Sequence, residues 1–340
     1  MKIGVLTGGG DCPGLNPAIR AITLRAMDYG DQLVGIRRGW AGLLDCDTCD
    51  LTLDVVEDLI RQGGTYLESS RTNPFKRDED VRRTVANIKD LGLDALIALG
   101  GEDTLGVANK LAKMGLPTVG VPKTMDNDLR GTDYTFGFNS ACQVAVEAAD
   151  RLKDTARSHR RIIVLEVMGR HAGWVALEAG VGAGADWILI PEVRADLDEM
   201  CEHLQQLRSR GKHYGLVVVS EGVKLPKARG KAARLDAFGH ERLQGAAAGI
   251  AQEVEARTGF ETREVVLGHI IRGGPPSAFD RMLATRVGIK AVELVHEGRF
   301  GTMAALRGTR IVSVPLEAAT SKLKRVPRRL YQEMKTLFNN

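Results

Sequence analysis

Four acidic residues follow two short apolar runs of this 340-residue chain, at positions where carboxylates could hold a metal ion or accept a proton. Two of them come just after the run Ala95–Leu99, and two follow the run Pro117–Val121. If both runs are neighbouring strands, four carboxylates gather at one edge of a sheet and repel one another unless a cation lies between them. Mg²⁺ carried by a phosphate suits such a site, since it binds through one or two carboxylates and phosphate oxygens. The four residues are Glu102, Asp103, Asp126 and Asp128.

A glycine-rich turn at residues 7–16 follows an apolar run and precedes a helix-like stretch. It does not fit a dinucleotide fingerprint, because Pro13 stands where the third glycine is required. Arg37 and Arg38 stand where a ribose-binding acid is expected. The turn still offers backbone N–H groups at a helix N-terminus, which suit a phosphate. For residues 7–16, the alternative is a tight turn with a structural role only. For the four carboxylates, the alternative is that they are acids in loops exposed to solvent.

Arginines placed near strand ends could clamp phosphate groups. Arg161 opens the apolar run Ile162–Val167, and Arg170 stands in the glycine-rich turn that follows it. Arg263 stands shortly before a second such turn, Gly268–Gly274. Single arginines on strands are usually surface salt-bridge partners, but guanidinium groups among glycine-rich turns can hold phosphates through paired hydrogen bonds.

These residues need a scaffold that brings strand ends together. Short apolar runs alternate with helix-like stretches along the chain, which predicts an α/β fold with parallel sheets and helices on both faces. In such sheets, ligands gather at the carboxyl ends of the strands. The expected strands are 3–6, 33–36, 95–99, 117–121, 162–167, 187–190, 215–220 and 264–267; the expected helices are 16–29, 54–62, 105–114 and 140–156; and a surface loop is expected at 224–237.

Composition narrows the class of protein. The chain is about twice the ~150 residues of a typical domain, so we expect two domains. Hydrophobic residues make up 44% and charged residues 26%, as in a globular protein rather than a disordered or disulfide-built one. A net charge of +4 is too small to argue for nucleic acid as a partner. No apolar run approaches the ~18 residues of a membrane span and no signal peptide is visible, so a cytoplasmic location is expected.

Five motifs together resemble the 6-phosphofructokinase family, in its order and spacing from residue 2 to about residue 320. The resemblance implies two Rossmann-like domains with mainly parallel sheets, the phosphofructokinase fold. Residues 1–137 and about 271–321 would bind the phosphoryl donor, and residues 138–270 and about 322–340 would bind the sugar phosphate. The motifs are Gly9-Gly10-Asp11, Gly100-Gly101-Glu102-Asp103-Thr104, Pro122-Lys123-Thr124-Met125-Asp126-Asn127-Asp128, Met168-Gly169-Arg170 and Gly268-His269-Ile270-Ile271-Arg272-Gly273-Gly274.

The resemblance implies Mg²⁺-dependent phosphoryl transfer to the 1-hydroxyl of fructose 6-phosphate. Asp126 matches the general base that takes the proton of that hydroxyl, as a carboxylate can. Thr124 matches the residue that holds the transferred group. Arg71 and Arg170 match cations near the transferring phosphates, where they would stabilise developing charge.

For the sugar phosphate, the resemblance implies a set of cations around the 6-phosphate and contacts to the sugar. In the family, the residues that match Arg161 and Arg263 reach in from a neighbouring subunit. This implies a homodimer or homotetramer with shared sites. The expected cations are Arg161, Arg263, His269 and Arg272, and the other expected substrate contacts are Thr124, Asp126, Met168, Gly169, Arg170 and Glu221.

The family uses either ATP or pyrophosphate as donor, and two residues favour pyrophosphate. ATP-using bacterial members typically have glycine where Asp103 stands, and a carboxylate there would repel the α-phosphate of a nucleotide. Lys123 would offer a compact positive charge to pyrophosphate, although it also occurs in some ATP-using relatives of the actinobacterial-like branch, which this chain resembles. An ATP-dependent 6-phosphofructokinase is the alternative. The expected donor site also includes Gly10, Arg71 and Glu102, the last as the Mg²⁺ ligand.

Two further hypotheses belong to other classes of protein. A nicotinamide-linked dehydrogenase is suggested only by the first glycine-rich turn. A sugar-phosphate sensor without activity would require loss of the base, and Asp126 is present.

One departure from the family pattern concerns the donor: Glu68 stands where relatives usually have glycine. Control by anionic effectors is expected to be weak, because Leu24 and Tyr214 stand where the family's effector pocket has basic or imidazole groups.

Overall fold

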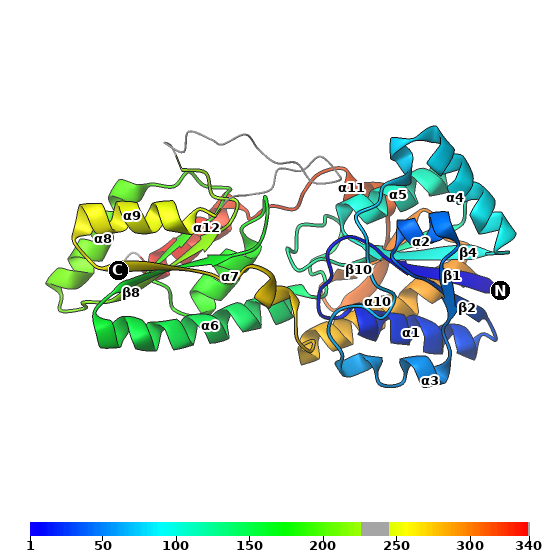
Figure 1. Cartoon of the computed structure of the whole chain (residues 1–340), viewed down its shortest axis with the longest axis horizontal. Coiled ribbons are helices and arrows are strands. Elements are labelled where there is room, and N and C mark those ends of the chain that lie inside the picture. The colour runs from blue at the N-terminus through cyan, green and yellow to red at the C-terminus, as the bar shows by residue number, and fades with distance from the viewer. Residues whose placement is uncertain (226–244, 339–340) are drawn as a thin grey trace.

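The computed structural model describes residues 1–225 and 245–338, and it shows two lobes, each built on one β-sheet (Figure 1). The larger lobe has a seven-stranded sheet in the order β11-β10-β5-β4-β1-β2-β3. The smaller lobe has a four-stranded sheet in the order β7-β8-β6-β9. The expected α/β fold with mainly parallel strands is therefore confirmed. Most of the expected loop 224–237 lies outside the described residues.

The larger sheet is parallel at its centre, and each of its edge strands runs antiparallel to its neighbour. Central strands β4 and β5 are buried along their whole length, as in a sheet covered on both faces. The strands are β1 (Lys2–Thr7), β2 (Gln32–Ile36), β3 (Thr48–Asp50), β4 (Ala95–Gly100), β5 (Thr118–Pro122), β10 (Thr302–Arg307) and β11 (Arg310–Pro315).

Helices cover both faces of this sheet, and alternate residues of each strand pack against opposite faces. Ile97 and Leu99 of β4 belong to the core on the α1 side, whereas Leu96 and Ala98 belong to the core on the α5 side. One face carries α1 (Leu15–Asp28), α3 (Leu53–Val56) and α10 (Ala278–His296), and the other carries α2 (Trp40–Asp45), α4 (Asp78–Asp90), α5 (Glu102–Lys113) and α11 (Leu316–Thr320) (Figure 1).

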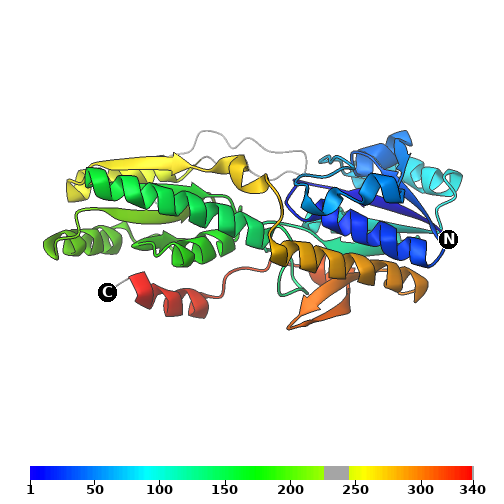
Figure 2. The same cartoon turned by 90° about the horizontal axis from the view of Figure 1, so that it is seen from below.

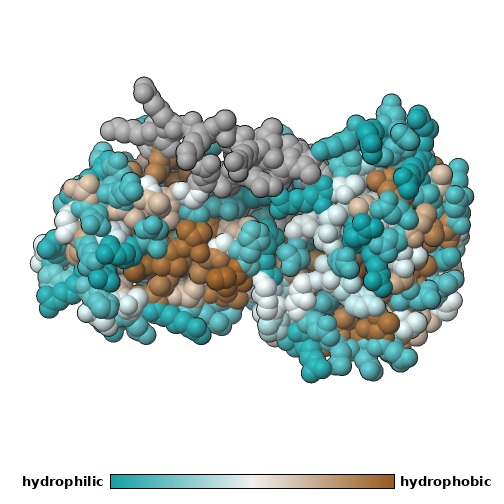
Figure 3. All heavy atoms as spheres, viewed as in Figure 1, coloured by the Kyte–Doolittle hydropathy of each residue, from teal (hydrophilic) through white to brown (hydrophobic). Residues whose placement is uncertain are grey.

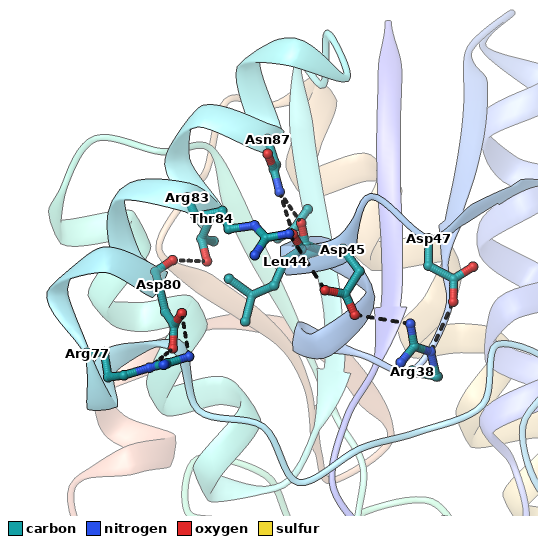
Figure 4. Close-up of polar contacts among 10 residues, drawn as sticks. Arg38, Leu44, Asp45, Asp47, Arg77, Asp80, Arg83, Thr84 and Asn87 are labelled. Atoms are coloured by element: carbon teal, nitrogen blue, oxygen red, sulfur yellow. Dashed lines mark hydrogen bonds and ion pairs between the residues drawn. The ribbon is translucent and has the colours of Figure 1, made fainter.

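Polar contacts tie α2 to α4 and to the end of β2 (Figure 4). The side-chain amide of Asn87 donates to two carbonyls in the last turn of α2, 2.8 and 2.9 Å away, where a helix leaves its carbonyls unpaired. Arg38 donates to Asp47 at 3.0 Å and to Asp45 at 3.2 Å. Arg38, which stands near the position of a ribose-binding acid in the sequence, therefore has local structural partners.

All four strands of the smaller sheet are parallel. Helices α6 and α7 pack on one side of it, and α9 lies on the other side with α8 beside it (Figure 1). Within the described residues, no helix is both long and apolar enough to span a membrane. The elements are α6 (Phe138–His159), β6 (Ile162–Val167), α7 (Trp174–Gly182), β7 (Trp187–Leu189), α8 (Leu197–Ser209), β8 (Gly215–Ser220), α9 (Ala247–Thr258), β9 (Thr262–Val266) and α12 (Arg328–Phe338).

The chain passes between the lobes at three points: at the start of α6, between β9 and α10, and between α11 and α12 (Figure 2). Asp280 of α10 is fully buried and caps the first of these crossings. Its Oδ2 accepts hydrogen bonds from the backbone N–H of Ser140 at 2.7 Å and from its hydroxyl at 2.5 Å. The assignment of one lobe to the donor and the other to the sugar phosphate stays a prediction.

Several expected elements have other ends than expected, and three of these differences affect the scaffold or a site residue. The expected helix 54–62 is split into α3 and a 3-10 turn at Leu59–Arg61. Helix α5 begins at Glu102, because acidic side chains in a first turn are stabilised by the helix dipole. Strand β9 begins at Thr262, so Arg263 lies within the strand rather than before it. The β10–β11 hairpin was not among the expected strands.

Gly137 is the residue before α6 and has a left-handed backbone (φ +95°), in which a Cβ would lie 2.5 Å from Cys12 Sγ. We expect Gly137→Ala to lower the free energy of unfolding by about 1–3 kcal/mol through backbone strain, with a further loss from this contact. Gly115→Ala is the matched control, because Gly115 has a similar φ of +86° and nothing within 4 Å of its Cβ position. Urea unfolding measures both, and equal losses would contradict the role of the contact.

Candidate active site

Parallel register brings three loops to one edge of the larger sheet. Thr7 pairs with Leu99 across β1 and β4, and Leu99 pairs with Val121 across β4 and β5, so the strands end level with one another. The loops that follow them surround a cavity at the junction with the smaller lobe. Its lining residues are Gly9, Gly10, Arg71, Gly101, Glu102, Asp103, Thr104, Lys123, Thr124, Asp126, Asp128, Arg170, His171, Arg272 and Leu323.

The cavity brings together most of the expected site residues, from β-strand ends and loops far apart in the sequence. Two lining residues belong neither to the expected set nor to the five motifs: His171 comes directly after Met168-Gly169-Arg170, and Leu323 lies in an interlobe crossing. The expected residues that line the cavity are Gly10, Arg71, Glu102, Asp103, Lys123, Thr124, Asp126, Arg170 and Arg272, and those that do not are Arg161, Met168, Gly169, Glu221, Arg263 and His269.

Asp126 is buried, and its carboxylate is only half satisfied. Its backbone N–H donates to Thr124 Oγ1 at 3.1 Å, and the Thr124 hydroxyl donates to Asp126 Oδ2 at 3.4 Å. Its Oδ1 is buried and has no hydrogen-bond partner among the described residues. A buried acceptor without a donor is costly, so this oxygen suits a ligand that brings a hydrogen.

Asp128 shows that negative charge is crowded here. Burial raises the pKa of its carboxyl to about 7, and the charges of Asp126 and Glu102 add to this effect. These carboxylates are oxygen ligands of the kind that Mg²⁺ prefers, so the site fits a divalent cation. Within residues 1–225 and 245–338, no three His, Cys, Asp or Glu side chains converge closely enough to hold a metal by themselves. A metal here would therefore take part of its ligands from a bound phosphate.

Positive charge faces these acids from the end of β5 and from the turn that follows β9. Lys123 is 4% exposed, and its ammonium donates to the carbonyl of Gly10. Burial lowers the pKa of Lys123, and the charge of Arg272 lowers it further. Arg272, expected near the 6-phosphate, donates to the carbonyl of Asp11 at 3.0 Å and so lies beside this same turn. An anionic ligand would relieve the repulsion between these two cations.

The loop that carries Arg170 is held by Glu221. Gly169 and Arg170 have φ values of +155° and +48°, and their N–H groups donate to Glu221 Oε1 at 3.2 and 3.0 Å. Burial raises the pKa of Glu221, and these two hydrogen bonds oppose that rise. Glu221 thus orients the loop, and its role as a sugar contact stays a prediction, as does that of Met168.

Arg161 and Arg263 lie away from the cavity of their own chain. Both pair with Glu261, at 2.8 and 2.5 Å respectively, beside the edge strand β9. Figure 3 shows an apolar patch on the smaller lobe over β9 and the turn after it, where Val266 is 55% and Ile270 66% exposed. Among the described strands, β9 is the last of its sheet, and proteins usually cover such an edge or protect it with charges.

Glu68 does not line the cavity. Its side chain is exposed and its backbone is left-handed, with φ +56°. Its carbonyl accepts a hydrogen bond from the Thr7 hydroxyl at 2.6 Å. The left-handed backbone explains why glycine would be favoured at this position. The Glu68 carboxylate is not among the residues that line the cavity.

Known proteins match this chain over most or all of its length. A family model described as phosphofructokinase matches residues 2–295. The chain is 54% identical over 342 residues to a pyrophosphate--fructose 6-phosphate 1-phosphotransferase of Dictyoglomus thermophilum, covering 100% of this chain and 99% of that one. A protein of the same name from Streptomyces coelicolor is 53% identical, over 99% of this chain and 100% of that one. An ATP-dependent 6-phosphofructokinase 3 of the same species is 51% identical, over 98% of each chain.

Solved structures share the fold. The phosphofructokinase of Pichia pastoris in the T-state has a TM-score of 0.84 and 30% identity, and the match covers 99% of this chain and 36% of that one. A pyrophosphate-dependent phosphofructokinase of Marinobacter aquaeolei has a TM-score of 0.83 and 23% identity, over 100% of this chain and 92% of that one. The latter likeness concerns the fold alone.

Proposed function

This chain belongs to the phosphofructokinase family, and we propose from this that it transfers a phosphoryl group from pyrophosphate to the 1-hydroxyl of fructose 6-phosphate. The products are fructose 1,6-bisphosphate and phosphate, and the reaction is reversible. The observation that carries the proposal is the buried Oδ1 of Asp126, which has no hydrogen-bond partner among the described residues and lies in a cavity lined by cations. The enzyme serves glycolysis and gluconeogenesis in the cytoplasm.

Asp126 acts on the acceptor. Its Oδ1 accepts a hydrogen bond from the 1-hydroxyl and takes that proton as the sugar oxygen bonds to phosphorus and the anhydride bond of the donor breaks. The second oxygen, held by Thr124, keeps the carboxylate in one orientation. Such positioning accounts for a large share of the rate in phosphoryl transfer, where the protein makes few covalent bonds.

Cations act on the phosphates. Lys123 lies at the end of β5 beside Gly10, and Arg71 and Arg170 approach the same cavity from two other loops. Held in a partly dry site, these groups stabilise the charge that develops on the transferred phosphoryl group and on the leaving phosphate. Arg272, His269, Arg161 and Arg263 are assigned to the 6-phosphate of the sugar.

Mg²⁺ is the proposed cation at Glu102, with Asp128 nearby. When bound, it would neutralise donor phosphate oxygens. Glu102 lies in the first turn of α5 and Asp128 at the end of the loop from β5. The raised pKa of Asp128, caused in part by Asp126 and Glu102, supports a cation at this point, because a cation would remove that repulsion.

Two residues argue for pyrophosphate over ATP. Asp103 adds a second carboxylate to the first turn of α5 at the cavity, where the α-phosphate of a nucleotide would meet like charge. Lys123 adds a buried positive charge that suits a compact dianionic or trianionic donor. An ATP-dependent 6-phosphofructokinase is the second candidate, favoured by ATP-named relatives of similar identity. An assay of fructose 6-phosphate with Mg²⁺ and either donor, with chelation as the control, decides between them.

We infer an oligomer with shared sites. Arg161 and Arg263 lie outside their own chain's cavity, and the exposed apolar edge of β9 runs beside them. A second copy that covers this edge would receive both arginines near its own sugar phosphate. A homodimer, or a homotetramer of such dimers, satisfies both observations.

Asp126→Asn keeps the shape of the side chain and removes the base. We expect the turnover number to fall at least ~10²-fold, with the Michaelis constant for fructose 6-phosphate little changed. Steady-state kinetics measures this, and Asp150→Asn, an exposed change on α6, is the control. Near-normal turnover of the Asp126 variant would remove it from the mechanism.

The donor choice is tested by the ratio of specificity constants for pyrophosphate and ATP. The parent should prefer pyrophosphate, and Asp103→Gly should shift the ratio toward ATP by relieving repulsion. The double variant with Lys123→Gly should shift it further than either single change, since paired charges rarely act additively. Asp103→Asn is the control that removes charge and keeps shape. A parent that prefers ATP, or a ratio indifferent to both changes at Asp103, would show the donor assignment to be wrong.

Arg263→Ala should mainly raise the Michaelis constant for fructose 6-phosphate, because it removes a phosphate contact made throughout the reaction. Glu264 is the next exposed residue of β9, and Glu264→Ala should leave the Michaelis constant for fructose 6-phosphate unchanged. Mixing inactive Asp126→Asn subunits with Arg263→Ala subunits should restore part of the activity, since one site of a mixed dimer then has both groups. No recovery after subunit exchange has been verified would argue against shared sites.

A further inference from the structure

The third crossing between the lobes, residues 321–327, passes directly behind the active-site loops. It runs from α11, which packs on α5 of the larger lobe, to α12, which packs on α7 and β7 of the smaller lobe (Figure 1). Leu323 from this segment lines the cavity. The next residue, Lys324, belongs to none of the expected motifs. It makes several hydrogen bonds with residues 127–133, in the loop that carries Asp126.

Lys324 holds the loop that carries the base. Its backbone N–H donates to the carbonyl of Asp128 at 2.7 Å. Its ammonium donates to Asn127 Oδ1 at 3.0 Å and to the carbonyls of Thr132 and Asp133 at 3.3 and 2.6 Å. An ammonium has three hydrogens, so each has an acceptor, and all the acceptors belong to this one loop.

Asn127 shows why the loop needs holding. It stands between Asp126 and Asp128, is 1% exposed, and has a left-handed backbone with φ +51°. A left-handed backbone costs most non-glycine residues about 1–2 kcal/mol and asparagine less, so contacts to the Asn127 side chain help to maintain it. Those contacts are the Lys324 ammonium and the N–H of Thr135, which donates to the same Asn127 oxygen at 3.2 Å. While Asn127 is turned toward Lys324, the two flanking carboxylates line the cavity.

The same segment also holds the loop that carries Arg170. Trp174, at the start of α7, donates its indole N–H to the carbonyl of Lys324 at 2.9 Å. The Lys324 ammonium lies 5.2 Å from the centre of the Trp174 ring. Glu192 makes a second link, since its Oε1 accepts from the N–H of Val326 at 2.9 Å and from that of Gly173 at 3.0 Å. The segment is therefore bonded to the base loop on one side and to the end of the arginine loop on the other.

We propose that Lys324 is a positioning residue that fixes the base loop, and with it Asp126, relative to Arg170 across the junction of the two lobes. It touches neither substrate nor reacting atoms and acts through Asn127, Asp128 and Trp174. This inference rests on the proposed function. A phosphoryl acceptor must be deprotonated by one loop while its incoming phosphoryl group is held by the other, and misplacement by about 1 Å can lower a rate ~10²-fold.

Lys324→Met keeps the length of the apolar stem and removes the ammonium. We expect its turnover number to fall 10- to 100-fold while the Michaelis constants for both substrates stay within about threefold. Arg325→Ala is the matched control, because Arg325 is exposed and adjacent, and it should keep the parent's kinetics. Trp174→Phe removes the indole donor to Lys324 and part of the ring beside the ammonium, and should give a smaller loss of turnover. Rates are normalised to the folded fraction, measured by circular dichroism at the assay temperature.

A double-mutant cycle with Asp126→Asn separates positioning from general stability. If Lys324 acts by placing the base, its removal costs much less in the Asp126→Asn background, because the placed group is already absent. Losses that multiply would overturn the proposal, as would an unchanged turnover number in Lys324→Met. If Lys324→Met does not fold, the same cycle is read with Trp174→Phe. A parent inactive with either donor would instead refute the proposed function, so the two failures are distinguishable.

Discussion

Like charges crowded at the ends of neighbouring parallel strands are the constraint on which the rest of this structure depends. Strands β4 and β5 end level, so the acids that follow them must share one cavity. Burial raises the pKa of Asp128 to about 7, and the neighbouring charges of Asp126 and Glu102 add to that rise. Cations from three separate segments lie in the same cavity and reduce the repulsion among these acids. They are Lys123 from the end of β5, Arg170 from the smaller lobe and Arg272 from the turn after β9. A cavity with both signs of charge, neither fully neutralised by the other, suits a phosphate that brings its own metal.

Both catalytic loops are backbone-strained and are held from outside themselves. Asn127 and Arg170 have left-handed φ values of +51° and +48°. Glu221 holds the second loop through two backbone N–H groups, and Lys324 holds the first through side-chain and backbone contacts. Strained positions persist only where surrounding contacts determine them, and here those contacts come from distant parts of the chain. The chemistry of the site therefore depends on how the two lobes are joined.

Much of the fold could be predicted from local pattern. The strands Ile162–Val167 and Gly215–Ser220 were predicted residue for residue, because buried parallel strands read as uninterrupted apolar runs. The helix expected at 54–62 was wrong in extent, since its pattern did not show where the helix would break. The membership of the phosphofructokinase family was also predicted, because five motifs in order constrain the whole chain. Leu323 and Lys324 were missed, as a linker next to a site has no periodicity or motif that would mark it.

The sequence by itself determined the alternation of strands and helices, the glycine-rich turns at strand ends and the residue types that could handle phosphate. These depend on spacing along the chain, which short-range geometry dictates. Only the tertiary structure decided which charges meet. Within the part of the chain that the structure describes, it left Asp126 Oδ1 without a hydrogen-bond partner. It also set Lys123 against Gly10 and paired Arg161 and Arg263 with Glu261, outside the cavity. Burial and electrostatic interaction depend on distances between segments that are remote in sequence, so no local pattern contains them.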